Sequence, residues 1–236
     1  MTHYPGGELE LFKAARNWKA YFARVIKPYL RGNVLEVGGG IGSTARVLAS
    51  GAIESWTALE PDPELARVYR ETTAQSFRFA VEVAVGSVAD LDPSRQFDAL
   101  LYIDVLEHIA DDRAELERAV RHLRAGGAMV VLAPAHQFLF SEFDAGLGHY
   151  RRYSRATLQS VVPPYLRRER LDYLDSVGLV ASLANKLMLH QSLPTPRQIQ
   201  FWDSCLVPLS RMLDPLLARR VGKSVLGVWR TAREEH

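Results

Sequence analysis

The chain has 236 residues, a formal net charge of +2 and a single cysteine, Cys205. This length suits one domain with a full core, and so small a net charge gives no reason to expect a nucleic-acid partner. One cysteine cannot form an internal disulfide, so nothing indicates an oxidising compartment. The N-terminus lacks the basic-then-apolar pattern of a signal peptide, and no stretch long enough to span a membrane is free of charges. We therefore expect a cytoplasmic protein.

Apolar runs and helix-compatible segments alternate through the first half of the chain. An amphipathic helix is predicted over residues 8–30, where Pro28 closes the segment. Buried strands are predicted at five apolar runs, residues 33–37, 56–60, 79–85, 97–103 and 128–133. Helical segments separate them, including residues 43–50 and 63–73. This alternation is typical of βαβ units with a mostly parallel sheet.

The second half is less regular. A polar and aromatic loop is predicted over residues 136–152, then a helix over 154–162 and a strand over 168–174. Apolar helices interrupted near residues 194–196 and at Pro208 precede a last strand over 224–230. We expect one α/β domain over residues 1–236, with an N-terminal helical cap, residues 1–30, and a helical lid insertion, residues 177–222.

The first strand runs into a turn in which every second residue is a glycine: Gly38, Gly40 and Gly42. Strand, glycine turn and helix together present backbone N–H groups to a ligand at the carboxyl edge of a parallel sheet. Side chains at these positions would block a ligand that lies against the backbone.

The spacing of this turn indicates which ligand it binds. A dinucleotide site needs a further glycine where this chain has Ser43, so that pattern fails. The pattern that holds is acid-x-Gly-x-Gly-x-Gly, with Glu36 as the acid. A carboxylate there repels a pyrophosphate but suits an ammonium group, which favours S-adenosylmethionine (SAM). Glu60, at the end of the second strand, can accept hydrogen bonds from ribose hydroxyls; alternatively, it only neighbours a helix N-cap. Because SAM and dinucleotides both carry a ribose, Glu60 does not discriminate between them.

Four stretches in order, residues 34–42, 59–62, 97–108 and 123–127, resemble the class I SAM-dependent methyltransferases. The resemblance implies a Rossmann-like, seven-stranded, mostly parallel sheet with an antiparallel last strand, a methyltransferase activity and SAM as the cofactor. It also implies that the three glycines line the methionine portion of SAM and that Glu60 binds the ribose.

The resemblance weakens after the third strand. Many members carry an acid there that meets the adenine amino group, whereas this chain has Ser87 and Val88 after Gly86. We expect the Ser87 side chain and the Val88 amide to replace it, with Asp90 as a weaker candidate. In such folds the position of Asp104 faces the methyl donor, so Asp104 either binds the methionine amino group or caps the next helix. Glu107 and His108 are given no chemical role.

Candidate acceptor residues follow the fifth strand. Methyl transfer requires an aligned acceptor and, for a hydroxyl, removal of a proton. His149 is the first choice for the general base and His136 the second, because a neutral imidazole accepts a proton near pH 7; alternatively, His149 only holds the loop by hydrogen bonds. Expected substrate contacts are Asp144, Arg151, Arg152 and Tyr153.

The two arginines match an anionic acceptor or form a solvated or capping pair. Residues 146–154 resemble a segment of methyltransferases that modify polysaccharides, lipids and secondary metabolites. No carboxylate cluster of the metal-dependent catechol type follows the fourth strand, so we expect no catalytic metal.

The apolar segment 177–220 is expected to form a lid over the acceptor; a homodimer contact or a peripheral membrane contact stays open. The sequence thus predicts a metal-independent enzyme that methylates a small-molecule, lipid-linked or sugar-linked acceptor, at oxygen. The alternatives are N- or C-methylation, a non-catalytic SAM-binding protein and an NAD-linked oxidoreductase.

Overall fold

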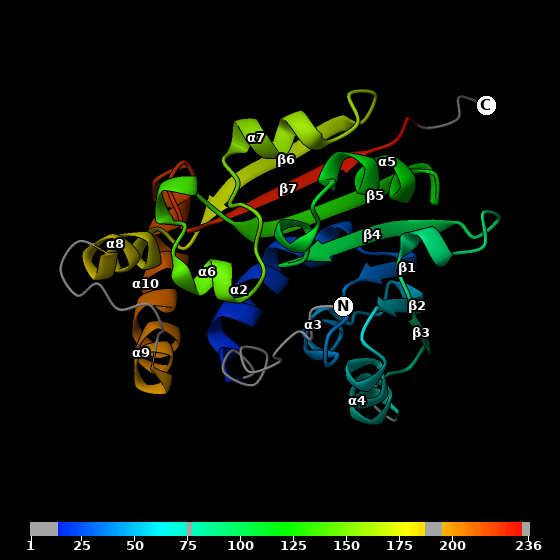
Figure 1. Cartoon of the computed structure of the whole chain (residues 1–236), viewed down its shortest axis with the longest axis horizontal. Helices are drawn as coiled ribbons and strands as arrows, with labels where there is room; N and C mark the ends of the chain where they lie inside the picture. Colours follow the sequence, from blue (N-terminus) through cyan, green and yellow to red (C-terminus); the bar gives the residue numbers. More distant parts are fainter. Residues whose placement is uncertain (1–13, 75–76, 187–194, 233–236) are drawn as a thin grey trace.

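The computed structural model describes residues 14–74, 77–186 and 195–232. Their strands form one seven-stranded sheet in the order β3-β2-β1-β4-β5-β7-β6 (Figure 1). Strands β1 to β5 pair in parallel, and β7 pairs antiparallel with both β5 and β6. The predicted mostly parallel sheet with an antiparallel last strand is therefore confirmed.

The strand bounds follow the apolar runs closely, because each run supplies residues for both faces of a covered sheet. The strands are β1 Gly32–Val37, β2 Ile53–Glu60, β3 Ala80–Val85, β4 Phe97–Ile103, β5 Leu123–Pro134, β6 Arg167–Leu174 and β7 Ser224–Arg230. The bounds of β4 and β7 are those predicted. Strand β5 begins earlier than predicted, since Gly126 and Gly127 lie within it and bond to the segment after β7.

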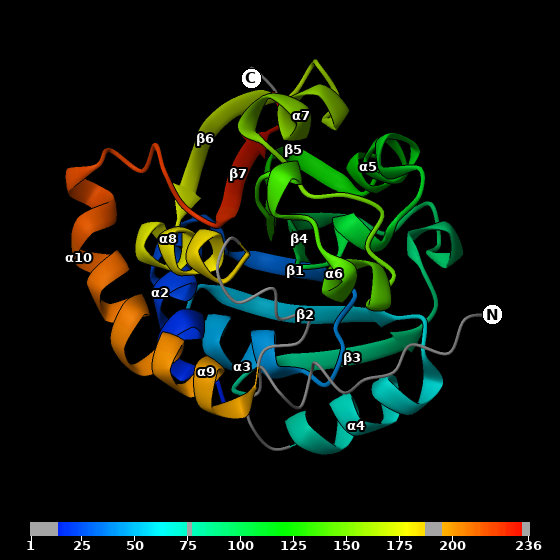
Figure 2. The same ribbon diagram turned by 60° about the vertical axis from the view of Figure 1, so that its left-hand side comes forward.

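Helices cover both faces of the sheet. They are α2 Arg16–Ile26, α3 Ser43–Leu48, α4 Pro63–Thr73, α5 Asp112–Val120, α6 Glu142–Gly146, α7 Arg155–Val161, α8 Ser176–Ala184, α9 Pro196–Phe201 and α10 Val207–Leu216. One core cluster joins the sheet to α2, α3 and the inserted helices, and a second joins it to α5 and α7 (Figure 2). Neighbouring residues of one strand, such as Val34 and Leu35, enter opposite clusters.

Two predictions about the second half were wrong. The expected loop 136–152 contains a 3-10 turn, Gln137–Leu139, and helix α6, which Ser141 and Asp144 stabilise as a capping box. The expected break at Pro208 is absent, because this proline lies in the first turn of α10, where its missing N–H costs no helical hydrogen bond. A π-helical turn, Trp202–Leu206, joins α9 to α10 instead.

Buried carboxylates fix the inserted helices to the N-terminal helix α2. Asp203 accepts a hydrogen bond from the Trp18 N–H at 2.9 Å, and the Trp18 and Trp202 rings lie 5.9 Å apart. Asp214 accepts the Tyr21 hydroxyl at 2.6 Å. None of the helices in the described part of the chain is long and apolar enough to cross a membrane.

Candidate active site

The glycine loop takes a backbone path that other residues rarely adopt. Gly38, Gly40 and Gly42 have φ angles of +70°, +55° and +77°. A Cβ on Gly38 would lie 2.5 Å from a methyl group of Val105. The Gly38 N–H donates to the Leu59 carbonyl at 2.8 Å, which ties the loop to the end of β2. The loop therefore needs glycine for its own conformation and packing, in addition to any ligand.

Glu36 supports this loop from the core. Its side chain is buried, and one carboxylate oxygen accepts hydrogen bonds from the Tyr69 hydroxyl at 2.7 Å and the Trp56 indole N–H at 3.0 Å. Burial raises the pKa of Glu36 to about 7, although both hydrogen bonds oppose this rise. The structure thus gives Glu36 a supporting role, and its contact with SAM stays a prediction.

Glu60 lies directly against the glycine loop. One of its oxygens accepts the Gly40 N–H at 2.7 Å and the other accepts the Asp62 N–H at 3.0 Å. The side chain is nearly buried, and burial raises its pKa. Because two backbone donors fix the carboxylate, its remaining lone pairs point in set directions and suit a pair of ribose hydroxyls.

The residues after β3 are committed to local structure. The Ser87 hydroxyl and N–H both donate to Asp90, each at 2.8 Å. The Val88 side chain is buried. An adenine contact through the Ser87 hydroxyl would compete with Asp90, so the predicted roles of Ser87 and Val88 stay predictions.

Asp104 follows β4 with a left-handed φ of +53°. Desolvation by the surrounding protein raises the pKa of its carboxyl to about 6, and electrostatic interactions with His149, Lys223 and Arg152 oppose this rise. The structure therefore brings the end of β4 together with residues more than forty positions further along the chain.

Asp144 is the centre of a buried polar network in α6. Its carboxylate accepts a hydrogen bond from His149 Nδ1 at 3.1 Å and two from the Arg152 guanidinium at 2.8 and 2.9 Å. Ser141 adds two further donors. Burial opposes ionisation, but these hydrogen bonds outweigh it and hold the pKa of Asp144 well below its usual range. Asp144 therefore orients His149 and Arg152, and its predicted contact with a substrate stays a prediction.

Two other residues predicted to contact the substrate, Tyr153 and Arg151, have partners within the protein. The Tyr153 side chain is buried, and its hydroxyl donates to Asp112 at 2.7 Å. Arg151 forms an ion pair with Asp112 at 2.6 Å and donates to the Ala110 carbonyl at 2.7 Å. Both residues hold the start of α5, and their predicted contacts with a substrate stay predictions.

His136, the second candidate base, lies at the end of β5 with a strained φ of +67°. Its Nε2 donates to the Gly222 carbonyl at 2.9 Å, and its ring lies against those of Phe138 and Tyr173. Burial lowers the pKa of His136, so the ring is neutral near pH 7.

Sequence reasoning missed Lys223 as a site residue. Its Nζ lies 4.1 Å from the Trp202 ring centre and 3.9 Å from the buried Asp175 carboxylate. Burial lowers the pKa of Lys223, and both Asp175 and Asp104 oppose that effect. The predicted direction of β7 could have identified Lys223. An antiparallel strand begins at the edge of the sheet where the parallel strands end, so the residue just before β7 lies at that edge.

Glu107, His108 and His149 also converge at this edge. Each offers one ligand atom, and these atoms all lie within 4.8 Å of one another. The His108 and His149 rings meet edge to face, with centres 4.4 Å apart. Burial, with a contribution from His149, lowers the pKa of His108 to about 4.

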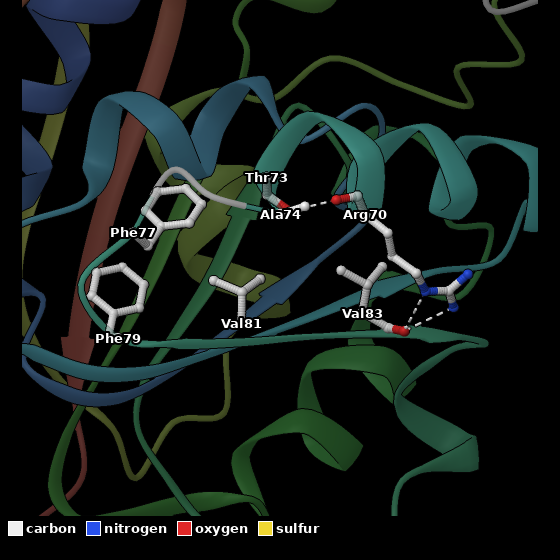
Figure 3. Close-up of a pocket in the computed structure, with 7 residues that line it drawn as sticks. All are labelled: Arg70, Thr73, Ala74, Phe77, Phe79, Val81 and Val83. Carbon is white, nitrogen blue, oxygen red and sulfur yellow. Dashed lines mark hydrogen bonds between the residues drawn. The ribbon is translucent and has the colours of Figure 1, made fainter.

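A pocket of about 350 Å³ lies elsewhere, between α4 and the edge strand β3. Its lining is mostly apolar, including Phe77, Phe79, Val81 and Val83, and the Arg70 guanidinium closes one side by bonding the Val83 carbonyl (Figure 3). None of the predicted site residues lines it.

Residues 35–129 match a family described as a methyltransferase domain. The predicted resemblance to SAM-dependent methyltransferases is therefore confirmed over this region. The match runs from β1 into β5 and includes the glycine loop, Glu60 and Asp104, so the residues predicted to bind the cofactor lie inside the matched region.

Two curated relatives share this region. The chain is 30% identical over 120 residues to the ubiquinone biosynthesis O-methyltransferase of Paramagnetospirillum magneticum, covering 49% of the chain and 47% of that protein. It is 28% identical over 109 residues to the ajmaline N-methyltransferase of Rauvolfia serpentina, covering 45% of the chain and 38% of that protein. The alignments thus span about half the length of these relatives or less.

Solved structures share the whole fold. The methyltransferase bound to the Trm112 activator of Haloferax volcanii superposes with a TM-score of 0.63 at 19% identity, covering 92% of this chain and 91% of that chain. At 19% identity this likeness concerns the fold alone.

Proposed function

We propose that the protein transfers the methyl group of SAM to a hydroxyl oxygen of a small-molecule, lipid-linked or sugar-linked acceptor. The observation that carries this proposal is the common edge of the sheet, where the glycine loop, Glu60 and Asp104 lie with the His149–Asp144 pair. This edge joins a cofactor cradle to a group that can take a proton from an acceptor.

The cradle suits SAM by shape and charge. Glu60 would hold the ribose, and the loop from Gly38 to Gly42 would lie along the methionine portion. Asp104 would face the positively charged end of the cofactor, which favours a cation over a phosphate. When bound, SAM supplies an electrophilic methyl group on a sulfonium, so the protein has to align the acceptor and remove a proton.

His149 is the proposed base. Because its Nδ1 donates to the Asp144 carboxylate, the proton of the neutral ring is on Nδ1 and the lone pair is on Nε2. Asp144 would also stabilise the imidazolium that forms after proton transfer. His136 has the opposite arrangement, with Nε2 donating and Nδ1 available, and is the alternative base.

Calorimetry with SAM and NAD in parallel tests the cofactor. We expect SAM to bind and NAD not to bind, and Glu60→Gln should weaken SAM binding. Release of S-adenosylhomocysteine with a panel of phenols, amines and polyprenyl-linked acceptors then tests the reaction. Turnover with amines alone would favour N-methylation, and SAM binding without turnover on any acceptor would favour a binding protein.

His149→Gln and His136→Gln separate the two bases. Loss of turnover in the first variant, with SAM affinity retained, supports the proposed role. Unchanged turnover in His149→Gln would exclude it as the base.

We also propose that helix α10 contacts an anionic membrane surface. Several apolar side chains of this helix are exposed, namely Leu209, Met212, Leu213 and Leu216, and the exposed Arg211 and Arg220 flank them. Cosedimentation with phosphatidylglycerol vesicles tests this proposal. Binding should fall for Met212→Glu and at high salt. A concentration-dependent dimer without vesicle binding would assign the face to a second copy of the chain.

A further inference from the structure

Lys223 is a charged residue at the edge of the sheet that the proposed function does not use. It directly precedes β7, and its backbone is fixed from two sides. Its N–H donates to the Asp175 carbonyl at 3.1 Å, and its own carbonyl accepts the Ala135 N–H at 2.8 Å. The preceding residue, Gly222, has no room for a side chain, because a Cβ there would lie 2.2 Å from the Leu174 carbonyl oxygen. The backbone therefore holds Lys223 in one place beside the end of β5.

The contacts that stabilise the ammonium of Lys223 use none of its N–H donors. Its Nζ lies 4.1 Å from the centre of the Trp202 ring, which is a cation–π contact. It also lies 3.9 Å from an Asp175 carboxylate oxygen, which is beyond hydrogen-bond distance. Among the residues that the structure describes, none accepts a hydrogen bond from this Nζ. A lysine ammonium has three donors, and all three are therefore available to a ligand.

Asp175 does not need these donors. Its fully buried carboxylate accepts the Trp202 indole N–H at 2.7 Å, the Ser210 hydroxyl at 2.6 Å and the Gly178 N–H at 3.1 Å. Three direct hydrogen bonds satisfy most of the lone pairs of a carboxylate. The Lys223 side chain, by contrast, is 27% exposed. The ion pair thus positions the ammonium at the edge of the sheet and leaves its N–H groups for another partner.

The charges around Lys223 favour a ligand with one negative charge. The guanidinium of Arg152 is already paired with Asp144, at 2.8 and 2.9 Å. Lys223 also interacts electrostatically with Asp104. In the proposed function, on which this inference rests, Asp104 faces the positively charged end of SAM, so its charge is balanced once the cofactor is bound. Lys223 then attracts an anion, while the carboxylates of Asp104 and Asp175 disfavour the second negative charge of a phosphate monoester.

We propose that Lys223 binds a carboxylate group of the methyl acceptor and thereby selects hydroxylated carboxylic acids over their neutral analogues. Both candidate bases are connected to this position. His136 donates through Nε2 to the carbonyl of Gly222, the residue before Lys223. Asp104 interacts electrostatically with both Lys223 and His149. The ammonium would thus hold the acceptor at the edge that carries the proposed base and the methyl donor.

Equilibrium binding of matched acids and esters tests this proposal without any need for turnover. The full-length protein is mixed with excess S-adenosylhomocysteine, which keeps the ammonium of SAM. It is then titrated in a calorimeter with para-hydroxybenzoate, para-coumarate and hydroxydecanoate, and with the methyl ester of each. We expect at least one acid to bind about 10-fold or more tightly than its ester. Lys223→Met, which keeps the length of the side chain but not its charge, should abolish this preference, and Lys223→Arg should retain most of it.

Lys27→Met is the matched control. Lys27 lies shortly before β1, at the opposite edge of the sheet, so the same substitution there should leave the preference for the acid unchanged. Lys223→Met leaves the buried Asp175 without its ion pair. The double variant Lys223→Met with Asp175→Asn removes both charges and should also bind acid and ester alike. Circular dichroism excludes unfolding as a cause of lost binding.

Two results would overturn the role of Lys223: no acid binds in preference to its ester, or Lys223→Met keeps the preference of the wild type. para-Hydroxyphenyl phosphate is titrated in parallel, and tighter Lys223-dependent binding of this phosphate would overturn the choice of a carboxylate.

SAM calorimetry on the same samples keeps the two proposals distinguishable. SAM binding together with equal binding of acids and esters would refute the role of Lys223 and leave the proposed function in place. A Lys223-dependent preference for the acid without SAM binding would refute the proposed function and leave the carboxylate site intact.

Discussion

Ionisation of the buried Glu36 should make the fold less stable as the pH rises towards neutrality. Burial raises the pKa of this carboxyl from 4.5 to about 7. Between these values the unfolded chain loses the proton while the folded chain keeps it. The folded state therefore binds more protons, and the free energy of unfolding falls with increasing pH across this window. At 1.36 kcal/mol per pH unit, the loss is complete near pH 7 and amounts to about 3 kcal/mol.

Glu36→Gln removes this dependence. The amide is neutral at every pH, has nearly the same shape, and its oxygen can still accept the hydrogen bonds from Tyr69 and Trp56. We expect the stability of the variant relative to the wild type to rise by about 2–3 kcal/mol between pH 5 and pH 8. Any cost of the substitution itself appears as a constant offset.

Urea unfolding at pH 5, 6, 7 and 8 measures this difference. All other titrating groups are common to both proteins and cancel. Glu64→Gln is the control, since Glu64 is exposed and hydrogen bonds from Arg67 lower its pKa, so its difference from the wild type should be flat over this range. A constant difference between Glu36→Gln and the wild type from pH 5 to pH 8 would refute the assignment of the raised pKa to Glu36.

Three further predictions follow from single contacts. Gly38→Ala should destabilise the fold by about 2–3 kcal/mol in urea unfolding, because of its positive φ and the contact with Val105, and adding Val105→Ala should recover only the steric part. Asp144→Asn should lower the free energy of unfolding by about 3 kcal/mol in the same assay, because it leaves the buried guanidinium of Arg152 without its anionic partner. A loss below about 0.5 kcal/mol would contradict this prediction. Glu60→Ala should weaken SAM binding by about 10-fold or more in calorimetry, and unchanged affinity would remove its proposed ribose contact.

The cofactor half could be predicted because its signals are local. A strand, its turn and the next helix are neighbours in sequence, so the apolar run of β1 and the alternating glycines describe the loop almost completely. Predicting the role of Glu60 required only the position at which the next strand ends. What the sequence did not provide was the reason for Gly38, because the Val105 side chain that excludes a Cβ comes from the segment after β4.

The acceptor half could be predicted only as a set of residues. Composition indicated that residues 136–153 are dense in polar groups, but their partners decide their roles. Arg151 and Tyr153 are used by Asp112, which is distant in sequence and gave no signal. The sequence predicts Asp144 and Arg152 as two separate substrate contacts, whereas in the structure they form one ion pair.

The predicted cofactor side of the site is held by contacts that are local in sequence, and the predicted acceptor side by contacts between distant segments. The cofactor cradle is stabilised within β1, β2 and the segments that follow them. The acceptor side depends on contacts of long sequence separation, among them the pair of Lys223 with the buried Asp175. Asp175 also accepts the Trp202 indole N–H at 2.7 Å and the Ser210 hydroxyl at 2.6 Å, so the inserted helices determine where Lys223 lies. We expect a change in those helices to move Lys223 while leaving the glycine loop and Glu60 in place. For that reason the identity of the acceptor has to be sought in residues 136–223, where the methyltransferase domain match no longer applies.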